Sequence, residues 1–206
     1  IDTQGRRIYT IYLKNLRRQE CLRYTIPGTN GQIVWANDNH TLFYLQRDPK
    51  TLLAYQVFRH RLGSEVNTDD LVYEQTDHQF YTGLAKSRDQ QHLYIHHNST
   101  TSAGASILPA DHPEQPPTLL HPLEADHEYH VAHCKGVFYI QTNWQAKNFR
   151  LMRATGDQIS DKSQWQTVVA HEAQQLLEDF EVFTEHLVYI RRIHGQAQLF
   201  VLDLTR

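Results

Sequence analysis

The sequence predicts an all-β protein, a fragment of a β-propeller built from four-stranded antiparallel blades. The first observation behind this prediction is a short apolar pattern with a central aromatic residue, which occurs four times, at 41–45, 92–95, 137–140 and 187–190. The copies that start at 42, 92, 137 and 187 are 50, 45 and 50 residues apart. A fixed period of roughly 40 to 50 residues is typical of repeat architectures.

The second observation is a partner segment upstream of each copy. The copies are apolar at consecutive positions, which is typical of strands covered on both faces. Other apolar or aromatic segments precede them, at 33–36, 81–84, 129–131 and 180–183. Turn-forming residues lie between the two segments, at 37–39, 87–89 and 134–136. Each pair therefore predicts a β-hairpin.

The third observation is that further strand-like segments follow each copy. The expected third strands are 55–60, 105–108, 149–153 and 199–202. The expected outer strands are 70–73, 118–120 and 166–169. Four antiparallel strands per repeat describe a propeller blade. We therefore expect full blades at 31–75, 78–122 and 127–172.

The two ends of the chain predict incomplete blades. Residues 1–30 contain Arg7–Leu13 and Leu22–Ile26, which resemble the third and fourth strands of a part-blade. Residues 177–206 form a second part-blade, whose last predicted strand is 198–204. The chain begins with Ile1 rather than Met, so we expect it to be a piece of a longer protein.

Two segments allow other interpretations. Residues 99–118 are rich in Ser, Thr, Ala and then Pro. A linker there would split a repeat between its second and fourth strands, and prolines also suit connections and edge strands, so we reject a domain boundary. Residues 171–178 could form two helical turns, but strands are expected on both sides, so an extended loop is favoured.

Composition excludes several classes of protein. The 206 residues are 40% hydrophobic and 21% charged, with a net charge of -3, as in a soluble globular protein. A basic stripe for nucleic acid is missing, and no run reaches the ~18 apolar residues of a membrane span. Cys21 and Cys134 lie in different repeats, which favours a reducing compartment, and we expect a cytoplasmic location.

A group of metal-ligating residue types occurs between 127 and 134. It comprises His127, Glu128, His130, His133 and Cys134. On a strand, the period of two places His127 and His133 on one face and His130 and Cys134 on the other. A helical pair of ligands is also missing. We therefore interpret these residues as polar strand ends and expect no metal and no cofactor.

The sequence assigns no catalytic residue. Gly104 and Ser106 match the first half of the Gly-x-Ser-x-Gly motif of a hydrolase nucleophile elbow. Residue 108 is Leu instead of Gly, so the motif is incomplete and Ser106 is expected to be structural. The segment Gly28–Gly31 lacks the Lys-Ser/Thr pair of a phosphate loop and is expected to be a turn between repeats.

Two further sets of residues have structural interpretations. Tyrosines recur at what we expect to be the same register of each second strand, where core packing between blades requires them; they are Tyr44, Tyr94, Tyr139 and Tyr189. A propeller with its own active site needs carboxylates that converge on the ring axis. The carboxylates Glu178, Asp179 and Glu181 cluster in one unit only, which predicts a solvated face.

Several stretches resemble the oligopeptidase B (protease II) branch of the prolyl oligopeptidase family. The match is longest over 34–38, 41–44 and 48–60, and it continues at 70–74, 126–129, 147–149 and 187–189. That family consists of serine peptidases in which a seven-bladed propeller limits substrates by size over an α/β-hydrolase domain. Oligopeptidase B cleaves short peptides after Arg or Lys.

The resemblance implies that this chain is about four of the seven blades, without the catalytic α/β-hydrolase domain. Its implied partners are that missing domain and, in the parent protein, short peptide substrates. The truncated blade ends also predict self-association. The alternative is a freestanding propeller for protein interaction, although the Trp-Asp and Gly-His signatures of such repeats are missing.

Overall fold

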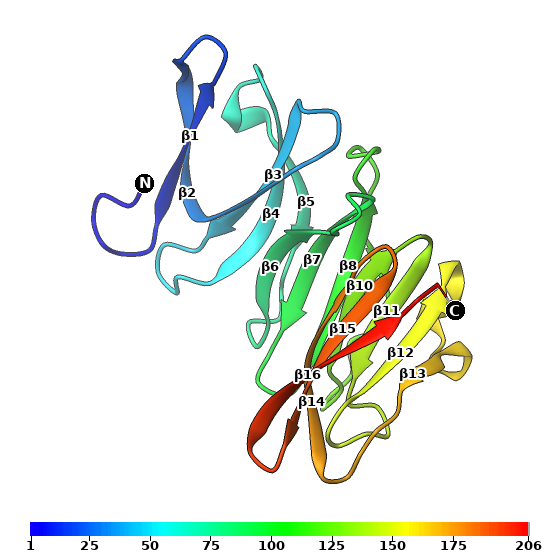
Figure 1. Cartoon of the computed structure of the whole chain (residues 1–206). Coiled ribbons are helices and arrows are strands. Elements are labelled where there is room, and N and C mark those ends of the chain that lie inside the picture. The colour runs from blue at the N-terminus through cyan, green and yellow to red at the C-terminus, as the bar shows by residue number, and fades with distance from the viewer. Residues whose placement is uncertain (206) are drawn as a thin grey trace.

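Within the described residues, the chain forms four antiparallel sheets that contain sixteen strands (Figure 1). The computed structural model describes residues 1–205, apart from the side chain of Asp157. Within this range, helix is confined to three 3-10 turns, namely η1 (Val66–Thr68), η2 (Gly156–Ser160) and η3 (Lys162–Gln164). None of them is long and apolar enough to cross a membrane. The prediction of an all-β propeller fragment is confirmed.

In every sheet, strands that follow one another in the chain are hydrogen-bonded neighbours, so each sheet is a meander. Sheet 1 contains β1 (Tyr9–Asn15), β2 (Glu20–Trp35), β3 (Thr41–Arg47), β4 (Ala54–Arg61) and β5 (Asp70–Glu74). Sheet 2 contains β6 (Tyr81–Lys86), β7 (His92–Asn98), β8 (Ala103–Pro109) and β9 (Thr118–Leu119). Sheet 3 contains β10 (Tyr129–Cys134), β11 (Val137–Thr142), β12 (Arg150–Thr155) and β13 (Gln166–Val169). Sheet 4 contains β14 (Gln175–Val182), β15 (His186–Ile193) and β16 (Gln196–Asp203).

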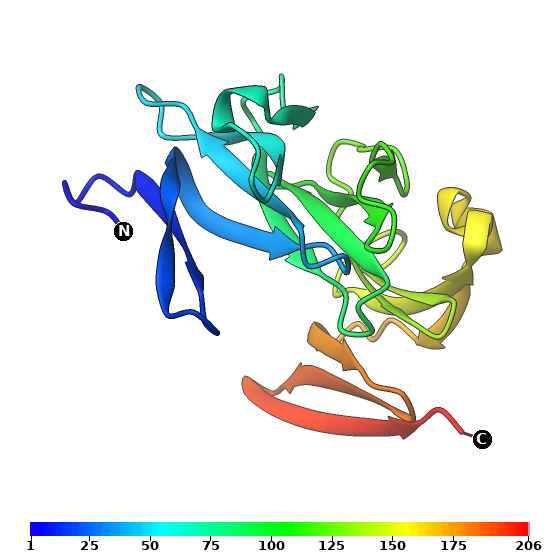
Figure 2. The same cartoon turned by 90° about the horizontal axis from the view of Figure 1, so that it is seen from above.

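The four sheets stand side by side in an open arc, with the two termini at its ends (Figure 2). Apolar side chains fill the space between successive sheets. Phe43 of sheet 1 packs with Leu93 and Ile95 of sheet 2, and Tyr139 of sheet 3 packs with Leu187 of sheet 4. A middle sheet is therefore buried on both faces, which explains the consecutive apolar positions of β7 and β11. The second face of β3 is covered by the β1–β2 hairpin, since Leu42 packs with Ile11 and Ile26.

The four recurrent tyrosines lie on β3, β7, β11 and β15, the second strands of the predicted repeats, but their register is not the expected one. Tyr94 packs with Phe138 and Ile140 of the following sheet, and Tyr139 likewise faces the following sheet. Tyr44 and Tyr189 point the other way, toward the β1–β2 hairpin and toward sheet 3. The expectation of one register was wrong by one residue, because a shift of one position along a strand reverses the face.

The start of the chain also differs from the expectation. Instead of a strand that ends before residue 30, β2 continues from Glu20 to Trp35 and pairs first with β1 and then with β3. The segment Gly28–Gly31 is a bulge inside this strand, not a turn between repeats. Gly28 and Gly31 have φ of 75° and 91°, and the buried Thr29 Oγ1 donates to the Tyr9 carbonyl oxygen at 3.1 Å. Glycine supplies the positive φ that the bulge requires.

The two ambiguous segments are now resolved. Within residues 99–118, β8 pairs with β9 through Ser106 and Leu119, so the rejection of a linker is confirmed. Residues 171–178 form neither a helix nor a loop throughout. A short turn precedes β14, which begins at Gln175 and buries Leu177 against sheet 3.

Candidate functional site: a hollow lined by the first strands of three sheets

The first strands of sheets 2, 3 and 4 line a hollow with a volume of about 700 Å³. We call it the inner hollow. The strands β6, β10 and β14 bring polar side chains to it from segments far apart in the sequence. Its polar lining consists of Lys86, Ser87, Arg88, His96, Glu128, His130, His133, Gln141, Glu178, Asp179 and Glu181. The sequence pointed to six of these eleven residues, but as two unrelated groups, because only the stacking of sheets brings them together; the six are Glu128, His130, His133, Glu178, Asp179 and Glu181.

The acidic residues of β14 reach the inner hollow from a bulged strand. Pairing with β15 shifts between Leu177 and Asp179, so Glu178 is the extra residue. The carboxylate of Glu178 accepts a hydrogen bond from Arg192 Nε at 2.6 Å. The expected solvated face of Glu178, Asp179 and Glu181 is therefore, more specifically, one wall of a hollow.

Cationic and anionic groups meet across the mouth of the inner hollow. Arg88 Nε lies 2.8 Å from Glu181 Oε1 and so joins sheet 2 to sheet 4. The Arg88 guanidinium also lies 4.6 Å from the centroid of the Phe183 ring. Lys86 Nζ donates to the Asn37 side-chain oxygen at 2.6 Å. The cations on this side are thus already occupied.

Two histidines in the inner hollow are held neutral at pH 7. Burial lowers the pKa of His96 to about 4, and protonation of His130 would lower it further. Burial also lowers the pKa of His130, against the opposing effect of Glu128 and Asp179. Carboxylates beside neutral imidazoles can bind cationic groups and hydrogen-bond donors of a ligand.

Ser106 pairs with a histidine, but the pair is unsuited to catalysis. His97 Nε2 lies 2.9 Å from Ser106 Oγ, and the two residues are only 1% and 4% exposed. His97 Nδ1 has no hydrogen-bond partner, whereas a nucleophilic serine needs a histidine oriented by an acid and open to substrate. Burial further lowers the pKa of His97 to about 4. The geometry gives Ser106 a structural role.

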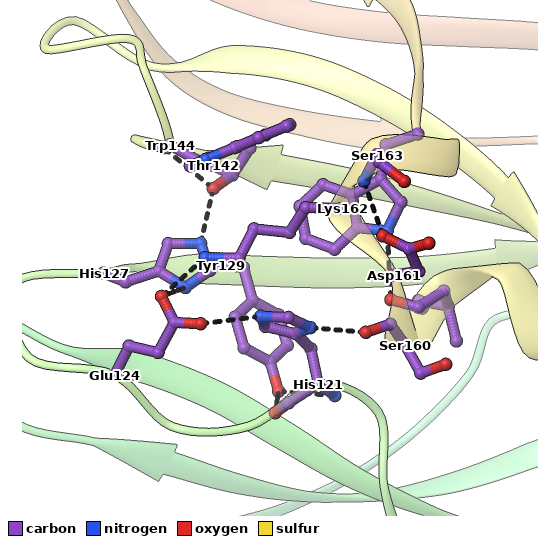
Figure 3. Close-up of polar contacts among 12 residues, drawn as sticks. His121, Glu124, His127, Tyr129, Thr142, Trp144, Ser160, Asp161, Lys162 and Ser163 are labelled. Carbon is purple, nitrogen blue, oxygen red and sulfur yellow. Dashed lines mark hydrogen bonds and ion pairs between the residues drawn. The ribbon is translucent and has the colours of Figure 1, made fainter.

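The histidines between 127 and 133 are divided among three places. His130 faces the inner hollow, and His133 lines the hollow as well but also joins Asp89 and His92. His127 joins His121 and Glu124 (Figure 3). Within each of the last two groups, the candidate ligand atoms lie within 4.8 Å of one another. The strand argument failed for His127 because β10 begins only at Tyr129. The spacing His-x2-Glu-x2-His at 121–127 was the signal that sequence reasoning missed.

Meandering sheets of three to five strands that stack in an arc, three of them with their first strands around a common hollow, define part of a β-propeller. Residues 1–206 match the family model described as "Prolyl oligopeptidase, N-terminal beta-propeller domain". The chain belongs to the prolyl oligopeptidase family.

Similar proteins are peptidases several times longer than this chain. Dipeptidyl aminopeptidase BI of Pseudoxanthomonas mexicana is 39% identical over 98% of the chain, and Protease 2 of Moraxella lacunata is 29% identical over 94%. The structure of oligopeptidase B from Leishmania major superposes with a TM-score of 0.91 and 28% identity over 98% of the chain. In each case the chain spans 28% of the relative's length.

Proposed function

We propose that this chain is the propeller portion of a serine oligopeptidase, in which it limits access to a catalytic α/β-hydrolase domain by substrate size. The match of residues 1–206 to the family's N-terminal propeller domain carries the proposal. Because the chain spans 28% of its relatives, the remaining length leaves room for a catalytic domain, which would be its partner.

The inner hollow supports a role toward short basic peptides. Two of its carboxylates, Glu128 and Asp179, flank the neutral His130, and neither belongs to the Arg88–Glu181 or Arg192–Glu178 ion pairs. A wall with surplus negative charge raises the local concentration of cationic peptides. This agrees with a parent enzyme that cleaves after Arg or Lys.

A second candidate activity is dipeptidyl aminopeptidase. It is favoured by one observation, the 39% identity to a relative with that name, against 29% to Protease 2. The two activities differ in whether the amino terminus of the substrate must be free. An oligopeptidase accepts a blocked amino terminus, whereas a dipeptidyl aminopeptidase requires a free one.

The test uses the full-length protein and fluorogenic peptides that end in Arg-Arg, with blocked and with free amino termini, in a series of increasing length. Cleavage of blocked short peptides supports the oligopeptidase, and cleavage of free-ended substrates alone supports the second candidate. A length limit that moves in the Arg88→Ala variant, while the rate on the shortest peptide stays constant, supports filtering by the propeller. Equal rates at every length would contradict it.

The gene provides the separate test of the freestanding alternative. A Gly-x-Ser-x-Gly segment encoded beyond residue 206 supports the peptidase, and a stop codon there supports a protein-interaction module.

We also propose a cytoplasmic location, because Cys21 and Cys134 are both free thiols. Fractionation of cells, followed by detection of the protein in the soluble cytoplasmic fraction, tests this location.

A further inference from the structure

The connection between sheets 2 and 3 brings two imidazoles and a carboxylate together (Figure 3). His121 Nε2 lies 3.1 Å from Glu124 Oε1, and His127 Nδ1 lies 3.8 Å from Glu124 Oε2. The two histidines are 6% and 5% exposed, whereas the side chain of Glu124 is 45% exposed. The cluster is therefore buried on the histidine side and open to solvent on the carboxylate side.

Proton counting shows that the cluster has room for a cation. His121 Nδ1 lies 2.9 Å from the Ser160 carbonyl oxygen, which can only accept, so Nδ1 carries the proton. In a neutral His121, the lone pair of Nε2 therefore points at a carboxylate oxygen of Glu124, and these two acceptors repel each other. Either a second proton or a metal ion on Nε2 removes this conflict.

His127 decides between the proton and the metal ion. Its Nε2 lies 3.0 Å from Thr142 Oγ1. Its Nδ1 has no hydrogen-bond partner, since 3.8 Å to Glu124 is too long for a hydrogen bond. A second proton on His121 would leave this buried nitrogen unsatisfied. An ion bound by His121 Nε2, His127 Nδ1 and Glu124 would satisfy all three groups.

We propose that His121, Glu124 and His127 bind a divalent transition-metal ion, for which Zn²⁺ is the best candidate. Two imidazoles and one carboxylate are ligands that Zn²⁺ accepts, with water in the fourth position. Ca²⁺ and Mg²⁺ prefer sites made of oxygen atoms alone. All three ligands lie in the connection between β9 and β10, so the ion would hold this connection in a single conformation.

The surroundings of both histidines match those of metal ligands. Metal-bound histidines usually donate the second ring N–H to a carbonyl, a carboxylate or another fixed acceptor. Here the Ser160 carbonyl oxygen and Thr142 Oγ1 take that place. The rings of Tyr129 and Trp165 pack edge-on against His121, with centroids 5.9 and 5.7 Å away, and fix its orientation.

In the absence of an ion, Lys162 forms an ion pair with the carboxylate of Glu124. Its Nζ lies 2.5 Å from Glu124 Oε2, and the Trp144 ring centroid is 5.8 Å away. The ammonium group and a metal ion would compete for Glu124. Removal of Lys162 should therefore strengthen metal binding, which a purely structural salt bridge would not predict.

The experiment is calorimetric titration of chelator-treated protein with ZnCl2, paired with thermal unfolding. We expect one ion per chain and a rise in the unfolding temperature. His127→Gln should weaken binding by ~100-fold or more and Thr142→Val by ~10- to 100-fold, because even indirect partners of metal ligands have effects of that size. Lys162→Met should strengthen binding by about tenfold through relief of charge repulsion.

His112→Gln is the matched control, because His112 is an exposed histidine that lies 3.4 Å from a glutamate, Glu114. Its zinc affinity should equal that of the wild type. Circular dichroism checks that each variant keeps its β signal, and the visible absorption of bound Co²⁺ reports the ligand geometry. If His127→Gln does not fold, the gain in Lys162→Met still tests the site. Absence of zinc binding in the wild type, or equal affinity in wild type, His127→Gln and Lys162→Met, overturns the proposal.

Discussion

Buried histidines are the residues whose chemistry depends most on this fold. His97 is 1% exposed, packs its ring 4.9 Å from that of Tyr73 and uses only one of its two nitrogens. Burial disfavours the charged imidazolium and lowers its pKa from 6.5 to about 4. A change of one pKa unit corresponds to ~1.4 kcal/mol. Protonation of such residues is therefore coupled to unfolding.

We expect the chain to lose stability as the pH falls from 6.5 toward 4. The folded-state pKa of His97 lies below the unfolded value, so in this window the unfolded state binds the proton and the native state does not. The resulting loss of unfolding free energy is close to zero above pH 6.5 and reaches ~3 kcal/mol for His97 near pH 4. Urea unfolding at pH 7.5, 6 and 5 measures it.

The His97→Gln variant separates His97 from the other titrating groups in this experiment, because glutamine cannot take up the proton. Its unfolding free energy should fall less steeply between pH 6.5 and 5 than that of the wild type. Parallel curves would show that His97 does not contribute.

Ser106→Ala should lower stability without affecting any enzymatic activity. The variant removes the hydroxyl 2.9 Å from His97 Nε2 and leaves a buried polar atom unpaired, which costs ~1–3 kcal/mol. The 206-residue chain itself should show no turnover of a fluorogenic Arg-Arg peptide. Thr100→Ala, an exposed change nearby, is the stability control. Turnover that survives repurification and disappears in Ser106→Ala would assign a catalytic role instead.

At the scale of elements, the positions of the strands could be predicted and the faces of their residues could not. The strands β3, β7, β11 and β15 were evident because each concentrates apolar residues in a short segment. A strand buried on both faces has no alternation of polar and apolar residues, so nothing in the sequence fixed which side Tyr44 or Tyr94 faces. The bulge in β2 was missed for a related reason, since its glycines also suit a turn.

The histidine cluster shows the same limit for a site. His127 was recognised as a potential ligand, but the strand period was applied to a residue that precedes β10. Its partners His121 and Glu124 lie in the irregular connection between β9 and β10, where no helix or strand period relates residue spacing to distance. The residues of the inner hollow come from three sheets, so only the tertiary structure groups them.

Two strand glycines provide a matched test of packing between sheets 2 and 3. A Cβ added to Gly104 in β8 would lie 2.6 Å from Leu123 Cδ2 and 2.8 Å from the Tyr129 ring. The nearest atom to a Cβ on Gly83 in β6 is 3.7 Å away, an ordinary contact. Gly104→Ala should therefore destabilise the chain by ~1–3 kcal/mol through overpacking.

Gly83→Ala is the control and should be neutral or stabilising by up to ~1 kcal/mol, because alanine restricts the unfolded chain. Chemical denaturation of the two variants, compared with wild type, measures the difference. If both substitutions had the same effect, close approach at Gly104 would not be the cause.

At the scale of the whole molecule, we expect the 206-residue chain to self-associate. The outer strand β16 exposes Leu199 and Val201 by 64% and 56%, and the N-terminal hairpin exposes Tyr12 by 53% and Leu16 by 74%. An apolar patch of even a few hundred Å² represents several kcal/mol of unrealised burial at ~25 cal/mol per Å². Unpaired edges of β1 and β16 add backbone groups that a second copy could bind.

Sedimentation velocity at ~100 μM tests this prediction, since that concentration exceeds the micromolar affinities that such burial supports. The double variant Leu199→Lys and Val201→Lys should shift the distribution toward monomer. A single monomeric species for the wild-type chain would contradict the prediction.

The contact between Arg88 and Glu181 joins sheets that are not neighbours, and its energy sets how often the mouth of the inner hollow opens. Both side chains are about half exposed, at 54% and 49%. An ion pair of this kind is worth at most ~1 kcal/mol. By the Boltzmann relation, at least about one molecule in six then has the pair broken at any moment. We therefore expect the mouth of the hollow to exchange between closed and open forms, and added salt, which screens exposed charges, to shift the population toward the open form.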